Sequence, residues 1–171
     1  MRLRTVLAFS LACAFCLLLI PKGAHAVRQD NLILCSAVQG QILDGGQPVS
    51  GQKVKRLVHW NMEKEPRVEL TTTNADGQFQ FPEIKGSADF GVFARLFHVP
   101  VISIRIYVPI EKSEYMAYAT SRNSYKKSDE TGLTQIGIKC DLQNKTFFND
   151  RLPVIDCKVE ESHERKSLNY D

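Results

Sequence analysis

The stretch Thr71–Phe81 most constrains what this chain can fold into, because turn-forming residues there separate two strand-like segments. Asn74, Asp76 and Gly77 lie between a threonine-rich run and an alternating Phe-Gln-Phe run. Glycine adopts positive φ without steric cost, and Asn or Asp side chains accept hydrogen bonds from nearby backbone N–H groups. This composition predicts a β-hairpin, whose two phenylalanines are expected to face the core together because alternate residues of a strand share a face.

Alternating apolar and polar residues predict strands along most of the remaining chain. The clearest is Val101–Val108, in which four aliphatic side chains fall on one face. About eight strands separated by turns indicate an all-β fold and favour a β-sandwich over a barrel or an α/β sheet. The other expected strands are Leu34–Leu43, Lys53–Met62, Arg67–Thr73, Gln78–Phe81, Tyr115–Thr120, Gly132–Leu142 and Leu152–Val159.

Two segments depart from this alternation. Arg56 interrupts the inward-facing positions of its strand, which indicates a bulge or an exposed edge. Between Pro82 and Pro100 the apolar residues recur at helical spacing, with Ser87 as an N-cap, and predict one short helix. We expect this helix to cap an open end of the sandwich; the alternative is a lid that faces a ligand or a partner. The residues that carry the helical pattern are Phe90, Phe93, Ala94 and Phe97.

Residues 1–26 have the three parts of a secretory signal peptide. Arg2 and Arg4 precede an apolar run, Val6–Ile20, which is shorter than the ~20 residues needed to cross a bilayer, and a small-x-small site ends at Ala26. We expect cleavage after Ala26, no transmembrane anchor, and a periplasmic or secreted mature chain. A single domain is expected over residues 27–159, followed by a charged, disordered tail over residues 160–171.

The charge balance of the mature chain bears on its partners. The signal peptide holds three of the 22 Lys and Arg residues and none of the 19 Asp and Glu residues, so 19 basic side chains remain against 19 acidic ones. A chain so close to neutrality has no overall attraction for polyanions. We therefore expect no nucleic-acid partner.

Three cysteines, Cys35, Cys140 and Cys157, follow the predicted signal peptide and would meet an oxidising compartment. Cys140 continues an inward-facing series in its strand, and Cys35 lies at the start of the first strand. We predict a disulfide between Cys35 and Cys140, with Cys157 as the odd thiol. The rival pairing is Cys140 with Cys157, and a buried free thiol is the remaining alternative for any of them.

Motifs that mark catalysis or metal binding do not occur in the sequence. It has no Gly-x-Ser-x-Gly, His-Glu-x-x-His, phosphate-loop or dinucleotide pattern. We interpret His59 and His98 as ordinary surface histidines. A half-match to a calcium loop starts at Thr72 but lacks the first carboxylate, and the acidic turn residues are dispersed. We predict no catalytic residue, no metal and no cofactor.

Three segments carry a resemblance to a known domain: Val38-x-Gly40-x-Ile42-x-Asp44, Pro48-Val49-x-Gly51-x-x-Val54 and Thr73-x-Ala75-Asp76-Gly77-x-Phe79-x-Phe81. Together they resemble the carboxypeptidase regulatory-like domain, which implies a transthyretin-like β-sandwich. A wider arrangement that adds Leu34-Cys35-Ser36, Phe97–Ile102 and Ile138–Leu142 resembles an uncharacterised bacterial secreted family built on that domain. The resemblance implies an accessory or binding module that supplies no catalysis of its own.

Small size, export and the lack of a catalytic set predict a non-enzymatic module that binds another protein in the cell envelope. One specific hypothesis is immunity, in which the module blocks a toxin delivered into the periplasm. The alternative is an accessory protein that binds an envelope polymer or carbohydrate, and an unrecognised hydrolase is the third class. The aromatic residues available for contact with a partner or ligand are Trp60, Tyr107, Tyr115 and Tyr118.

Export gives the first testable prediction. The chain purified from the envelope is expected to begin at Val27, because the signal peptide is removed after Ala26. Intact-mass measurement decides this. A retained leader, or an added lipid mass, would contradict it.

Overall fold

A computed structural model of the chain describes residues 26–91, 97–130 and 135–160. The chain divides into two compact units, one formed by Met1–Gln29 with Asp89–His98 and the other by Asp30–Ala88 with Val99–Asp171. The sheet discussed below lies in the second unit. The predicted signal peptide before residue 26 and the predicted tail after residue 160 fall outside the described residues.

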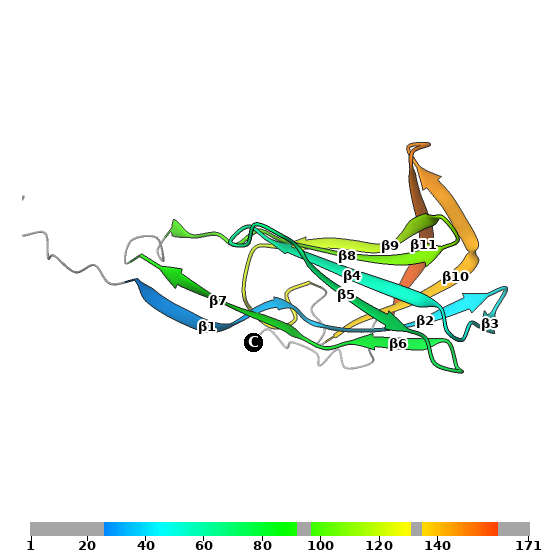
Figure 1. Cartoon of the computed structure of the whole chain (residues 1–171), viewed down its shortest axis with the longest axis horizontal. Coiled ribbons are helices and arrows are strands. Elements are labelled where there is room, and N and C mark those ends of the chain that lie inside the picture. Colours follow the sequence, from blue (N-terminus) through cyan, green and yellow to red (C-terminus); the bar gives the residue numbers. More distant parts are fainter. Residues whose placement is uncertain (1–25, 92–96, 131–134, 161–171) are drawn as a thin grey trace, which may run out of the picture. The chain divides into compact units, whose positions relative to one another are not determined.

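Almost all of the described chain is extended, which confirms the all-β prediction. Eleven strands occur among the described residues (Figure 1). They are β1 (Val27–Cys35), β2 (Ala37–Asp44), β3 (Gln47–Pro48), β4 (Lys53–Trp60), β5 (Arg67–Thr72), β6 (Gln78–Phe81), β7 (Ile84–Phe90), β8 (Ile102–Ile110), β9 (Ser113–Arg122), β10 (Gln135–Phe148) and β11 (Leu152–Glu160).

Nine of these strands form one sheet, in the order β3-β2-β10-β11-β9-β8-β4-β5, with β6 also paired to β2. β2 runs parallel to β10, and β11 runs parallel to β9. Strand β5 therefore ends one side of the sheet, whereas β3 and β6 end the other. Since β5 and β6 are consecutive in the chain, the sheet must curl until its two edges approach each other. Strands β1 and β7 form a separate two-stranded sheet.

The turn between β5 and β6 has the predicted local chemistry. Gly77 has φ +70°, and the Asn74 Oδ1 atom accepts hydrogen bonds from the backbone N–H of Asp76 at 3.0 Å and of Gln78 at 2.8 Å. The two phenylalanines that follow are only 5% and 3% exposed, so their inward direction is confirmed.

The predicted hairpin pairing is nevertheless wrong. β5 pairs with β4 and β6 pairs with β2, so the turn joins opposite edges of the curled sheet. Gly40 of β2 lies directly opposite Phe79, and a Cβ atom at Gly40 would stand 2.6 Å from the Phe79 ring. This close approach, available only to glycine, favours pairing of β6 with β2 over pairing with its neighbour in sequence.

The core lies on the inner face of the curled sheet. The predicted aliphatic face of β8, Ile102, Ile104, Ile106 and Val108, is fully buried. Inward-facing residues of β2, β4 and β10 pack on the same side, and each such side chain stabilises the fold by about 1.5–3 kcal/mol relative to exposure. They include Val38, Ile42, Val54, Val58, Trp60, Ile136 and Ile138.

Arg56 does not mark a bulge or an exposed edge, which corrects the sequence prediction. Its strand pairs without interruption on both sides, and its side chain is 0% exposed. The guanidinium donates a hydrogen bond to Glu69 of β5, with Nε 2.8 Å from Oε2. It also lies 4.8 Å from the ring centroid of Phe81 in β6, and its Nη1 atom is 3.7 Å from Sγ of Cys35. A buried arginine is tolerated here because it has a carboxylate and an aromatic face as partners.

The predicted short helix is not confirmed. Its expected cap, Ser87, and its first apolar residue, Phe90, lie in strand β7. Residues 92–96, which hold the middle of the pattern, fall outside the described residues. In the part of the chain that is described, no helix has the length and apolar character needed to span a membrane.

The predicted disulfide between Cys35 and Cys140 is wrong, and the rival pairing is the one that forms. Cys140 of β10 bonds to Cys157 of β11, its directly opposite neighbour in the antiparallel pair, with Cα atoms 4.3 Å apart. Cys35 is a buried free thiol. The sequence pattern placed Cys140 correctly as inward-facing, but register alone decides which cysteines touch.

A second buried ion pair closes the loop after β9. The side chains of Arg122 and Glu130 are both 0% exposed, and Nη1 lies 2.7 Å from Oε1. Glu130 also accepts hydrogen bonds from the Ser36 backbone N–H at 2.9 Å and from the Ser36 hydroxyl at 2.7 Å. Ser36 is the break between β1 and β2, so this carboxylate fixes the point where the chain passes from one sheet to the other.

Removal of the Cys140–Cys157 bond should destabilise the protein. The paired Cys140→Ser and Cys157→Ser variant is expected to lose about 3 kcal/mol of unfolding free energy, since the bond closes a short loop. Urea denaturation measures the loss, and non-reducing peptide mapping should recover the Cys140–Cys157 peptide. A Cys35–Cys140 peptide would contradict the assignment.

The Cys35 thiol should be inert in the folded protein. Burial raises its pKa from 9.0 to about 12, so almost no thiolate forms at neutral pH. Iodoacetamide is expected to label Cys35 only after unfolding. Because the raised pKa belongs to the folded state, its contribution to the unfolding free energy is intact below pH 9.0 and is lost as the pH rises toward about 12.

Glu130→Ala is expected to destabilise the fold by about 3–5 kcal/mol, because it leaves the buried Arg122 charge without a carboxylate, with only the carbonyls of Ser124 and Lys126 as acceptors among the described residues, and removes the acceptor of Ser36. Glu114→Ala is the matched control: this carboxylate pairs with Lys55 but is 50% exposed, and its loss should cost about 1 kcal/mol or less. Chemical denaturation measures both variants. Equal losses would show that the Glu130 network has no special structural role.

Candidate functional site

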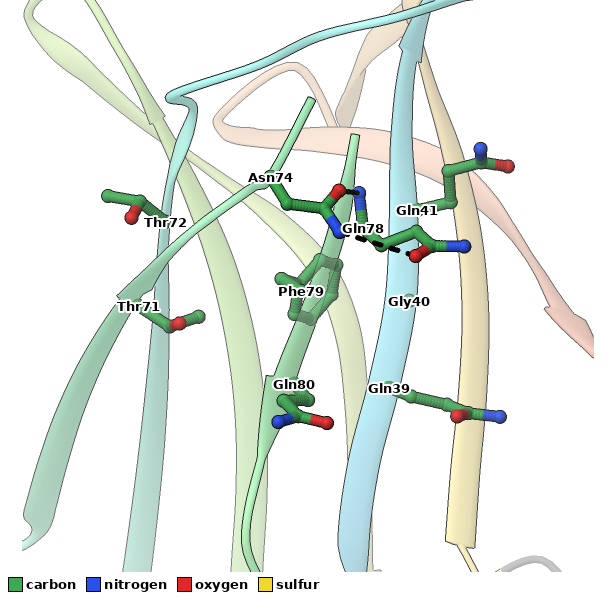
Figure 2. A pocket seen from close by; sticks show the side chains of 9 residues that line it. All are labelled: Gln39, Gly40, Gln41, Thr71, Thr72, Asn74, Gln78, Phe79 and Gln80. Atoms are coloured by element: carbon green, nitrogen blue, oxygen red, sulfur yellow. Dashed lines mark hydrogen bonds between the residues drawn. The ribbon is translucent and has the colours of Figure 1, made fainter. Parts of the chain in front are cut away.

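A groove of about 680 Å³ runs from β5 across β6 to β2 (Figure 2). Thr71 and Thr72 of β5 stand on one side, and the side chains of β6 and β2 form the other (Figure 2). The complete lining is Gln39, Gly40, Gln41, Thr71, Thr72, Asn74, Gln78, Phe79 and Gln80.

Register brings four glutamines together in this groove. Gln39 lies directly opposite Gln80, and Gln41 lies directly opposite Gln78, in the antiparallel β2–β6 pair. Between them Gly40 and Phe79 face the core. Because successive side chains of a strand point to opposite faces, all four glutamines lie on the outer face of the sheet, away from the core.

Two hydrogen bonds hold the upper end of the groove. The Gln41 Nε2 group donates to the backbone carbonyl of Asp76 at 2.9 Å, and the Asn74 Nδ2 group donates to Oε1 of Gln78 at 3.3 Å. The side chains of Gln39 and Gln80 show no such bond in the described part of the chain, and Figure 2 shows the Gln39 side chain pointing from β2 away from β6.

The chemistry of the groove is neutral and polar. None of its nine lining residues carries an ionisable side chain. Each glutamine offers two amide donors and a carbonyl acceptor, and each threonine offers a hydroxyl that donates and accepts. The groove can therefore hydrogen-bond an uncharged, extended polar chain, but its own side chains include no general acid, base or nucleophile poised by a neighbouring charge.

The strands on either side of the groove each have an edge that pairs with no further strand. Among the described residues β5 pairs only with β4, and β6 pairs only with β2, although both backbone groups of Gln78 are hydrogen-bonded to Asn74. The free backbone N–H and C=O groups of such edges accept an added strand. Backbone and side-chain groups thus offer the same kind of contact on both sides of one groove.

Trp60 is not available for partner contact, contrary to the prediction. Its side chain is 1% exposed, and its indole N–H donates to the hydroxyl of Tyr125 at 3.1 Å. The Tyr125 ring meets the indole edge-on, with centroids 5.9 Å apart. Trp60 is therefore a core residue with its polar atom satisfied.

The three predicted tyrosines lie on the paired strands β8 and β9, outside the groove. The Lys55 ammonium lies 5.0 Å from the ring centroid of Tyr107. The Lys145 ammonium lies 6.0 Å from the ring centroid of Tyr115. Tyr118 is half-buried, and burial raises its pKa above the ordinary value. None of the three lines the groove.

The groove residues were missed because no single glutamine is distinctive. The signal present in the sequence is a repeated Gln-x-Gln, at Gln39-x-Gln41 and again at Gln78-x-Gln80. Only the pairing of β2 with β6, which are far apart in the chain, turns the two repeats into one surface. No group of three or more metal-ligating side chains is found in the described ranges, and His59 is exposed on β4.

The fold and the groove define a small β-rich protein with a neutral, amide-lined groove. The chain belongs to the DUF6795 family, a domain of unknown function, whose family model matches residues 38–145. Among curated proteins and among solved structures, none matches the chain. The matched range contains every residue of the groove.

Gly40→Ala should damage the groove. A Cβ atom at this position would stand 2.6 Å from the carbonyl oxygen of Ile138 as well as from the Phe79 ring, so backbone must shift. We expect a loss of about 1–3 kcal/mol of unfolding free energy by denaturant titration. Gln39→Ala, at the adjacent exposed position, is the control and should change stability by no more than about 0.5 kcal/mol. Equal stability of both variants would refute the close packing at Gly40.

Proposed function

We propose that this protein is a non-enzymatic binding module that recognises another protein by holding an extended segment of it in the β5–β6 groove. The observation that carries the proposal is the coincidence of two unpaired strand edges with an uncharged lining of amides and hydroxyls. An extended peptide presents the same alternation of N–H and C=O groups as a strand, so both edges suit it.

Affinity and specificity would come from different parts of the groove. Backbone hydrogen bonds along an edge supply affinity for any extended chain. The glutamines select among chains, because a buried amide left without a partner costs about 1–3 kcal/mol. A segment with small or polar side chains is the best match for the groove, whose lining is mostly polar.

The cellular setting belongs to the same proposal. The signal peptide ending at Ala26 would place the mature chain in the periplasm or outside the cell. There the domain would act as an accessory module of transthyretin-like type, in line with the resemblance carried by Val38–Phe81. An immunity protein that blocks a toxin delivered into the periplasm is the most specific form of the proposal.

Binding of an envelope polymer or carbohydrate is the second candidate. A neutral groove lined by amides and hydroxyls also suits the hydroxyl groups of a neutral glycan. Sugar rings, however, are commonly held by exposed aromatic faces, and the one aromatic residue in the groove, Phe79, is 5% exposed. The groove therefore favours the protein partner.

The test is capture from envelope extract by the immobilised mature chain, read by quantitative mass spectrometry. Gln80→Glu adds a charge to the neutral groove and is expected to lower the yield of the captured partner at least tenfold. The change is isosteric and exposed, so the circular dichroism spectrum and the melting temperature should not alter.

Gln47→Glu is the matched control, because it makes the same chemical change at an exposed position in β3, outside the groove lining. It should capture the partner as well as the parent chain does. Equal loss in both variants, or capture that is unchanged by Gln80→Glu, would remove the groove from the proposal. Release of the chain by soluble glycan fragments would favour the second candidate.

A further inference from the structure

The hairpin formed by the ends of β10 and β11, defined here as the arm (Lys145–Ile155), extends beyond the pairing with β2, while Val154 and the buried Ile155 tie its base to the rest of the sheet. The pairing of β10 with β2 ends at Asp141, whereas β10 and β11 stay paired to the tip, where Phe148 lies opposite Leu152. Figure 1 shows the tip of this hairpin, in orange and brown, projecting away from β2. On its other side β11 meets β9 through the single register pair Val154 with Met116.

The base of the arm is held rigidly. The Cys140–Cys157 disulfide crosses it, just before the register shift between Cys140 and Lys145. In the irregular segment that follows, the Asp141 carboxylate accepts hydrogen bonds from the backbone N–H groups of Gly45 at 3.0 Å and Gly46 at 2.8 Å. Hydrogen bonds to the backbone, first that of Gln143, lower the pKa of Asp141 and keep it ionised as an acceptor.

The tip of the arm is a tight turn. Asn149 and Asp150 both have positive φ, 50° and 55°, and the Arg151 N–H approaches the Phe148 carbonyl at 3.3 Å. Two central residues of this conformation form the primed turn that matches the twist of a two-stranded hairpin. The arm is thus preorganised, which lowers the entropy cost of inserting it into a partner.

The arm is apolar on both faces. Phe147 and Phe148 are 59% and 61% exposed, and Leu152 is 39% exposed. Neighbouring residues of a strand point to opposite faces, so Phe147 with its opposite residue Pro153 occupies one face and Phe148 with Leu152 occupies the other. A flat surface covers only one of these faces.

We propose that the arm inserts into a cleft of a partner protein whose two facing walls are both apolar. A two-stranded ribbon packs about 10 Å from each covering layer, so the walls would stand about 20 Å apart. The apolar side chains exposed on the two faces, rigidly displayed and rich in phenylalanine, have the character of interface anchors. This inference uses β10 and β11 only and does not depend on the β5–β6 groove.

Two other occupants fit less well. A second copy of the chain, meeting arm to arm, would cover only one of the two apolar faces and leave the other in water. A membrane would have to accept the polar tip Asn149, Asp150 and Arg151, and the arm has only Lys145 and Arg151 as basic residues, fewer than the 4–8 typical of lipid-binding clusters.

The experiment places the photo-crosslinker p-benzoylphenylalanine at Phe147 or at Phe148 of the full chain, in cells that export it. Met62, 43% exposed in the turn after β4, is the control position. Both arm positions are expected to crosslink to the same protein, at two separate apolar segments of it, while the control position does not. Crosslinking from one face only, or from neither face, would overturn the two-walled cleft.

Two variants provide a further test. Phe148→Ser is expected to lower crosslinking from position 147 at least tenfold, and Phe147→Ser should do the same for position 148, with unchanged circular dichroism spectra because both side chains are exposed. Gln47→Glu, outside both the arm and the groove, should leave arm crosslinking unchanged. Adducts between two copies of the chain, or sedimentation of the purified chain with phosphatidylcholine and phosphatidylglycerol vesicles that Phe147→Ser abolishes, would refute the proposed cleft.

Discussion

The contact on which the curled sheet most depends is that of the buried Arg56 guanidinium. It projects from β4 into the interior and there meets Glu69 of β5 and the ring of Phe81 in β6. These two strands are the opposite edges of the sheet, so a single side chain contacts both. Burying a guanidinium carries a desolvation cost of several kcal/mol, and only partners held in a defined position offset it. The interaction therefore adds little to the net free energy of folding, and its main effect is to fix the position in which the two edges approach each other.

The candidate groove follows from this arrangement. Because the edges approach without pairing as strands, their outward residues surround one neutral groove, with Gln39 and Gln80 among its lining residues. A closed sheet would have no such edges. The contact that organises the interior thus also shapes the groove that we propose holds an extended partner segment.

The arm and the groove differ in their chemistry and in how the chain forms them. The groove is polar, uncharged and formed by strands far apart in the sequence, whereas the arm is a local hairpin with apolar side chains on both faces. The Cys140–Cys157 bond and the Asp141 carboxylate anchor the arm in place of a hydrophobic core, which a two-stranded ribbon lacks. A protein with both features offers hydrogen-bonding and hydrophobic recognition on separate elements.

The sequence by itself determined the all-β character, the inward face of β8, and the turn at Asn74 and Gly77, because these depend on alternation and on local backbone chemistry. It did not determine that β5 and β6 separate after that turn, that Arg56 is buried, or that Cys140 selects Cys157. Each of these depends on which distant strands pair and in what register, and a shift of one residue would exchange the two faces of a strand. The tertiary structure alone decided that Gln39 stands opposite Gln80, since the energy of that pairing comes from the core side chains beneath it, Val38, Phe79 and Phe81.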